Sequence, residues 1–372
     1  MENKEFFLKI YTELECLFKQ SIKEEIFPGA VVGISVFSGS KKEIFLASFG
    51  SATYDGLPLS KEIFYDLASL TKPLATTLAV ISLLKNKILD LQDTLSDLLE
   101  IELPKDKKNI KLIHLLGHCS GLPAYRPYFK DLAGKKIYRG SAVIKKIMAE
   151  KMAYKTGESQ LYSDLGFMLI GEIIKKKTSL RLDEYVNKKI YKPMGIDKLL
   201  FFNFNNKIKK GVNYAPTELC NWRKKLLYGQ VHDDNAFTMQ GVAGHAGMFG
   251  NIYGVTALVN YLIDIIEGRK DHPNINREYL NKFIKKNNNE SFGLGFDTPS
   301  SENSSSGHYF SEKSFGHLGF TGTSFWVDLE KKISIVLLTN RVHPDRKNEK
   351  IRKFRPVFHD LIMKKLMERR GK

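Results

Sequence analysis

The stretch Asp66-Leu67-Ala68-Ser69-Leu70-Thr71-Lys72 places a serine and a lysine three residues apart where a long apolar segment begins. On a helix, residues three apart are neighbours, so the amine of Lys72 can lie beside the hydroxyl of Ser69 and take up its proton. The start of a helix also directs unpaired N–H groups and the positive end of the helix dipole toward Ser69. This segment can therefore supply a nucleophile, a base and part of an anion site.

The same spacing occurs in Ser38-Gly39-Ser40-Lys41, so spacing alone does not identify a catalytic serine. That second pair lies in a polar stretch between two strand-like runs, residues 30–37 and 43–49, and the pattern predicts a hairpin turn with solvated lysines. Ser38 is therefore not expected to react, and it provides an internal control for Ser69.

The composition indicates a globular protein. The chain has 372 residues, of which 42% are hydrophobic and 11% aromatic, enough for one large domain or two closely connected ones. The formal charge of +17 comes from scattered lysine clusters, without interleaved aromatic residues and without a nucleic-acid-binding motif. Solvated lysine-rich faces are the expected explanation, and no nucleic-acid partner is predicted.

The chain carries no recognisable targeting pattern. Its N-terminal region is amphipathic and lacks the apolar core and cleavage site of a signal peptide, and no segment approaches the roughly 18 consecutive apolar residues of a membrane span. Cys16, Cys119 and Cys220 are odd in number and far apart, which suits a reducing compartment. We expect a cytoplasmic protein with no membrane partner, and the sequence leaves the oligomeric state open.

Strand patterns occur at both ends of the chain and helical patterns in the middle. The expected fold class is α+β, with an antiparallel sheet flanked by terminal helices and an inserted, mostly helical lobe. Residues 1–68 and 285–372 would form the discontinuous sheet domain and residues 69–284 the helical domain, with the active site at their interface. A last helix is expected from about residue 356 to 369, with Pro356 at its first position. Further strands are expected at 323–329 and 333–339, and further helices at 73–84, 110–116, 142–152, 165–175 and 253–266.

Two other segments carry chemistry. Tyr162-Ser163-Asp164 follows a turn at Gly157 and precedes a helical pattern, so a tyrosine there can project into a cleft. Further on, Gly316-His317-Leu318-Gly319-Phe320-Thr321-Gly322-Thr323 begins a C-terminal hairpin, and its glycines allow a ligand to lie against the strand backbone.

Together with Ser69 and Lys72, these segments resemble, in the right order, the motif set of the serine β-lactamase and penicillin-binding protein-like family. The resemblance runs from about residue 28 to 342 and is to the class C β-lactamase, D,D-peptidase and esterase type. It implies the β-lactamase/transpeptidase-like fold. By position it makes Ser69 the nucleophile and Lys72 and Tyr162 the proton-transfer pair, leaving open which of the two is the base.

The resemblance also implies a substrate site. The N–H groups of Ser69 and Phe320, beside Gly319, would form the oxyanion hole. His317 would contact a substrate carboxylate or help to move protons. A nearby cation and the helix start favour a phenolate at Tyr162, and burial favours a neutral Lys72.

Two departures from the family pattern bear on the substrate. Asp164 stands where the family usually has an amide, and a carboxylate cannot donate a hydrogen bond to an acylamino group. His317 and Leu318 replace a lysine and a threonine, which removes a permanent charge and a hydroxyl. We therefore expect a serine hydrolase that acts through an acyl-enzyme on an ester or amide, with a small-molecule ester, amide or peptide-like compound as its substrate. D,D-peptidase or D-aminopeptidase-like activity, or a non-catalytic ligand-sensing or scaffold role, are the alternatives.

The remaining polar candidates are ambiguous. His114, His118 and Cys119 have helical spacing but no third ligand with sensible spacing, so neither a metal nor a cofactor is predicted. His232, in the polar segment around Asp233, either lines the cleft or belongs to a turn that anchors the helical lobe. His245 is expected beside the cleft, with simple packing as the alternative.

Overall fold

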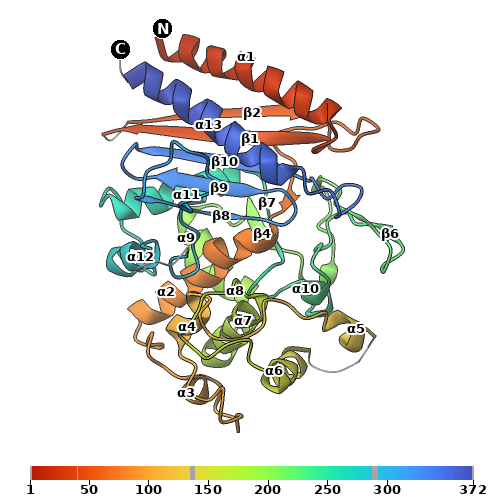
Figure 1. The fold of residues 1–372 in the computed structure, drawn as a ribbon, viewed down its shortest axis with the longest axis vertical. Coiled ribbons are helices and arrows are strands. Elements are labelled where there is room, and N and C mark those ends of the chain that lie inside the picture. The colour runs from red at the N-terminus through yellow and green to blue at the C-terminus, as the bar shows by residue number, and fades with distance from the viewer. Residues whose placement is uncertain (1, 40, 135–138, 287–291, 371–372) are drawn as a thin grey trace.

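The computed structural model describes residues 2–39, 41–134, 139–286 and 292–370. Its centre is a five-stranded antiparallel sheet in the order β2-β1-β10-β9-β8 (Figure 1). The strands are β1 (Gly29–Ser38), β2 (Lys41–Gly50), β8 (Ser314–Leu318), β9 (Ser324–Asp328) and β10 (Ile333–Thr339). The expected hairpin at residues 38–41 joins β1 to β2, with Ser38 paired to Lys41.

The two ends of the chain meet in the middle of this sheet. Strand β1 pairs with β10, with Ala30 opposite Thr339 and Val36 opposite Ile333. The terminal helices α1 (Glu2–Lys23) and α13 (Ile351–Arg370) lie together on one face of the sheet, and α11 (Ile252–Ile266) packs on the other face (Figure 1). The expected α+β fold with flanking terminal helices is thus confirmed.

The outer core lies between the terminal helices and the sheet. The fully buried ring of Phe18 stacks on Phe49 with ring centroids 4.5 Å apart, and it meets Phe27, Phe354 and Phe358 at steeper angles. One aromatic side chain therefore joins α1, β2 and α13.

The inner face of the sheet shares one continuous apolar core with the helical region. Val31 and Val336 of the sheet belong to the same buried cluster as Leu70 and Leu258. The proposed division at residues 68/69 and 284/285 consequently stays a prediction.

The helical region fills the lower half of Figure 1. Its helices are α2 (Leu78–Lys85), α3 (Leu95–Leu99), α4 (Leu112–Leu116), α5 (Phe129–Leu132), α6 (Arg139–Ala149), α7 (Asp164–Thr178), α8 (Leu182–Val186), α9 (Lys192–Met194), α10 (Asp234–Thr238) and α12 (Arg277–Phe283). Two small sheets accompany them, β3 (Tyr65–Asp66), β7 (Met248–Gly250) and β4 (Leu200–Phe202) in one, and β5 (Leu219–Cys220) and β6 (Lys225–Leu226) in the other.

Two expectations about helices are wrong in detail. The helix expected from residue 73 begins as a π-helical turn, Lys72–Thr77, and continues as α2. The last helix does not start at Pro356, which lies inside α13. Ile351 and Phe354 are buried ahead of Pro356, so packing stabilises the preceding turn although the proline supplies no N–H group.

Phe18→Ala should lower the free energy of unfolding by about 3–5 kcal/mol, because it removes a fully buried ring from a tight aromatic cluster. Urea unfolding monitored by circular dichroism measures the effect. Val357→Ala on α13 is the control, since this side chain is 54% exposed and should change stability by less than about 0.5 kcal/mol. Equal losses in the two variants would contradict the packing assigned to Phe18.

Candidate active site

Lys72 brings three other polar side chains together. Its Nζ donates to Ser69 Oγ at 3.0 Å, to Tyr162 Oη at 2.7 Å and to Asp164 Oδ1 at 2.7 Å. Ser69 lies in the 3₁₀ turn Ala68–Leu70, and Lys72 opens the π-helical turn that follows, so the two share one side of this segment. An alcohol, an amine, a phenol and a carboxylate thus meet around one nitrogen.

The start of α7 places Tyr162 and Asp164. Ser163 is the N-cap residue: its Oγ accepts from the N–H of Gly166, and its own N–H donates to His118 Nδ1 at 3.1 Å. The His118 ring lies 4.6 Å from the Tyr162 ring, which makes it a packing partner of the phenol.

The ionisation of the site differs from the expectation. Burial alone would lower the pKa of Lys72, but the charges of Asp164 and Tyr162 and their hydrogen bonds reverse this, and the pKa lies above its ordinary value. Burial raises the pKa of Tyr162; Lys72 opposes this rise and Asp164 adds to it, and the net pKa is raised. The resting pair is an ammonium and a phenol, so the expected neutral lysine and phenolate are both wrong. Sequence reasoning missed the ion pair with Asp164 that causes this.

A cavity of about 670 Å³ opens in front of these groups. Lys72, fully buried, lies behind its wall. The lining includes every other residue that the sequence suggested for the site: Ser69, Tyr162, Asp164, His232, His245, His317, Gly319 and Phe320.

His317 faces this cavity as a neutral group. Burial and the nearby Lys72 lower its pKa to about 3, and Nδ1 lies 2.8 Å from the carbonyl oxygen of Leu318. It therefore offers a substrate a hydrogen-bonding nitrogen and no positive charge at neutral pH. The neighbouring Gly319 has no room for a side chain, because an added Cβ would lie 2.0 Å from Thr323 Oγ1.

The segment around His232 combines the two roles that the sequence left open. Asp233 lines the cavity, and its Oδ1 also caps α10 by accepting the N–H of Ala236 at 2.7 Å. The same oxygen lies 2.9 Å from His245 Nε2. His232 pairs with Glu218 at 3.1 Å and stacks on Phe320, with ring centroids 5.6 Å apart.

Sequence reasoning missed the charged residues that the C-terminal region adds to the cavity. These are Asp297, Arg341, Arg346, Glu349, Arg352 and Arg355. Burial raises the pKa of Asp297 to about 7 and lowers that of Arg355 to about 9. Arg355 Nη2 donates to the carbonyl oxygens of Gly319 and Thr323, each at 2.9 Å, and so braces the turn between β8 and β9. No motif marks these positions: Arg352 and Arg355 lie on α13, and the other four lie in segments that precede it in the chain.

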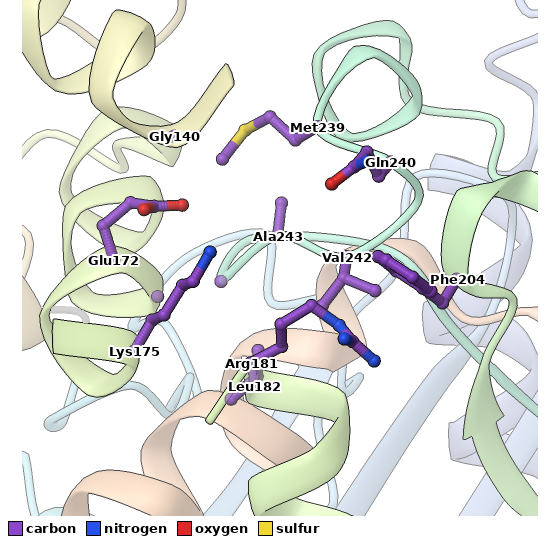
Figure 2. A pocket seen from close by; sticks show the side chains of 12 residues that line it. Gly140, Glu172, Lys175, Arg181, Leu182, Phe204, Met239, Gln240, Val242 and Ala243 are labelled. Carbon is purple, nitrogen blue, oxygen red and sulfur yellow. The ribbon is translucent and has the colours of Figure 1, made fainter. Parts of the chain in front are cut away.

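A second, much smaller pocket lies in the helical region (Figure 2). Figure 2 shows the side chains of Glu172, Lys175 and Met239 turned toward a common space beside Ala243. Its volume of about 40 Å³ has room for a few water molecules but not for an ester or a peptide.

Neither a metal site nor a membrane span is found in the described part of the chain. No group of three or more histidine, cysteine, aspartate or glutamate side chains there could hold a metal ion. None of the helices in that same part combines the length and apolarity needed to cross a bilayer.

Comparison with known proteins gives consistent matches. The family model described as Beta-lactamase matches residues 14–356. A Salmonella agona protein with the provisional name D-alanyl-D-alanine carboxypeptidase is 31% identical over 331 residues, covering 80% of this chain and 76% of the relative.

Solved structures resemble the fold at lower identity. The octameric penicillin-binding protein homologue from Pyrococcus abyssi has a TM-score of 0.73 at 21% identity, covering 95% of this chain and 77% of that one. EstCE1, a hydrolase with promiscuous acyltransferase activity, has a TM-score of 0.70 at 20% identity, with 93% and 98% covered.

Asp164→Asn should shift the pH dependence of Ser69 modification to lower pH. The carboxylate raises the pKa of both Lys72 and Tyr162, so its loss lowers both pKa values. The rising and the falling limb of the pH–rate profile should therefore both move to lower pH. The measurement is the rate of labelling by a fluorophosphonate between pH 5 and 10.

Asp264→Asn is the control for this shift. Asp264 is also buried and ion-paired, with Lys42 and Arg269, but it lies on α11 and does not line the cavity. Its profile should match that of the wild type. An unshifted profile for Asp164→Asn would contradict the assigned coupling.

Proposed function

The chain belongs to the Beta-lactamase family and is a serine hydrolase, and from that premise we propose that it works through an acyl-enzyme on a small ester or amide. Ser69 is the proposed nucleophile. The observation that carries the proposal is the contact of Lys72 Nζ with both Ser69 Oγ and Tyr162 Oη, at the wall of a cavity large enough for such a substrate.

The ionisation of the pair favours Tyr162 as the base. Asp164 lies 2.7 Å from the ammonium group of Lys72, and this ion pair keeps the pKa of Lys72 above its ordinary value. Loss of one proton from the resting pair then leaves a phenolate beside an ammonium, and the ammonium stabilises it. We assign to this phenolate the removal of the Ser69 proton as Oγ bonds to the substrate carbonyl carbon.

The remaining steps follow from the same groups. The N–H groups of Ser69 and Phe320 stabilise the oxyanion. Tyr162 then passes its proton to the leaving group as the bond to that group breaks, which gives an ester on Ser69. Water attacks this ester, its proton goes to Tyr162, and the acid is released while Ser69 recovers its hydrogen.

D,D-carboxypeptidase activity is the second candidate. The Salmonella agona relative bears that name provisionally, and Arg352 and Arg355 add positive charge to the cavity although His317 is neutral. A peptide carboxylate would find a partner on that wall.

We also propose a cytoplasmic location. None of Cys16, Cys119 and Cys220 forms a disulfide bond, and Cys16 is exposed, as suits a reducing compartment. An epitope-tagged protein should fractionate with cytoplasmic markers; recovery with envelope fractions would contradict this.

Ser69→Ala should abolish covalent labelling by a fluorophosphonate and lower ester hydrolysis by at least about a thousandfold, because it removes the proposed nucleophile. Intact-mass spectrometry detects the adduct, and p-nitrophenyl esters report turnover. Ser38→Ala is the matched control, since Ser38 has the same spacing to a lysine but lies at the end of the β1 strand. It should behave as wild type.

The same assay separates the candidate functions. Turnover of p-nitrophenyl esters without release of D-alanine from D-Ala-D-Ala peptides supports the esterase, and the opposite result supports the carboxypeptidase. A stable adduct at Ser69 with no turnover of any substrate would replace both with a ligand sensor.

A further inference from the structure

We propose that Asp66 is a positioning residue for Ser69: its carboxylate holds the residue before the nucleophile in a left-handed backbone conformation and ties it to the His232 segment of the cavity lining. The inference rests on the proposed function, in which Ser69 is acylated. Asp66 does not line the cavity, so it acts through the backbone.

Both oxygens of this carboxylate are used. Oδ1 accepts the N–H of Ala68 at 2.8 Å, and Oδ2 accepts the N–H of His232 at 2.6 Å. The side chain is only 2% exposed, and no lysine or arginine of the described chain lies within ion-pair distance of it. This buried carboxylate binds two backbone N–H groups, and both belong to residues that line the cavity.

The first of these N–H groups belongs to a strained residue. Ala68 has a φ of +46°, a left-handed conformation that costs an alanine roughly 1 kcal/mol or more. The conformation of Ala68 sets the direction from which the chain enters Ser69, and with it the 3.0 Å approach of Ser69 Oγ to Lys72. The hydrogen bond to Asp66 offsets this strain. A change in the backbone conformation of Ala68 would move Ser69.

Strand pairing and threonine hydrogen bonds fix the backbone at Asp66 and Leu67. Asp66 pairs with Phe249 between β3 and β7, and its carbonyl oxygen accepts from Thr321 Oγ1 at 2.7 Å. The next carbonyl, that of Leu67, accepts from Thr323 Oγ1 at 3.2 Å. Asp66 therefore stands where the nucleophile turn, the His232 segment and the glycine-rich turn meet.

The alternative is that Asp66 stabilises the fold without positioning Ser69. Another buried carboxylate of the chain serves as a comparison for this purely structural role. Asp328 is fully buried, and its Oδ1 accepts backbone N–H groups of Glu330 and Lys331 at the turn after β9. It resembles Asp66 in burial and in its backbone partners, but it contacts nothing in the catalytic cavity.

The experiment compares the rate at which a fluorophosphonate labels Ser69 in folded protein. Asp66→Asn keeps the shape but turns an NH₂ group toward one of the two N–H donors, so labelling should slow about tenfold or more. Asp328→Asn should label at the wild-type rate even if its melting temperature falls. Circular dichroism before labelling verifies that each variant is folded.

A second substitution isolates the role of Ala68. Glycine adopts positive φ without the steric cost of alanine, so Ala68→Gly in the Asp66→Asn background should restore most of the lost rate. Ala68→Gly alone should stay within about threefold of wild type. A merely structural Asp66 predicts no such rescue, because the labelling rate of the folded Asp66→Asn variant would not have fallen in the first place.

The outcomes are distinct. Folded Asp66→Asn that labels at the wild-type rate, or a slowed variant that Ala68→Gly does not rescue, overturns this inference and leaves the proposed function standing. A wild-type protein that takes no label at Ser69 overturns the proposed function, and this inference falls with it.

Discussion

A buried ammonium group is the constraint on which the site depends. Lys72 is fully buried, and a charge in that position is tolerated only with close partners. Asp164 supplies the opposite charge, while Tyr162 and Ser69 supply oxygen atoms within hydrogen-bond distance. The need to satisfy this ammonium therefore draws the start of α7 against the nucleophile segment, although the two are far apart in sequence.

The ion pair between Lys72 and Asp164 distinguishes the charge distribution of this site from the usual pattern of the family. At the position of Asp164 the family usually has an amide, which can face the substrate, whereas this carboxylate is engaged by Lys72. A neutral His317 further removes positive charge from the glycine-rich strand, and arginines from α13 and the segment before it return charge to a different wall. The cavity thus keeps the sequence motifs of the family, but its charged side chains lie at different positions.

The sequence predicted the parts of the structure that repeat a local pattern. Strand-like runs of residues identified β1 and β10, and apolar spacing identified α7 and α11 to within a few residues. Strands β4 and β7 are too short to show alternation, and the start of α13 ahead of Pro356 depends on burial of Phe354. The grouping of candidate residues around one cavity followed from motif order, but the protonation of Lys72 and the presence of Arg355 depend on distances that a sequence does not contain.

The pairing of β1 with β10 has a consequence for synthesis of the protein. The neighbour of Ala30 is Thr339, so the centre of the sheet cannot close until the chain has been synthesised through residue 339. Until then the apolar faces of β1 and α1 have no C-terminal partners. Catalytic competence should therefore arise only after β10 has been synthesised and has paired with β1.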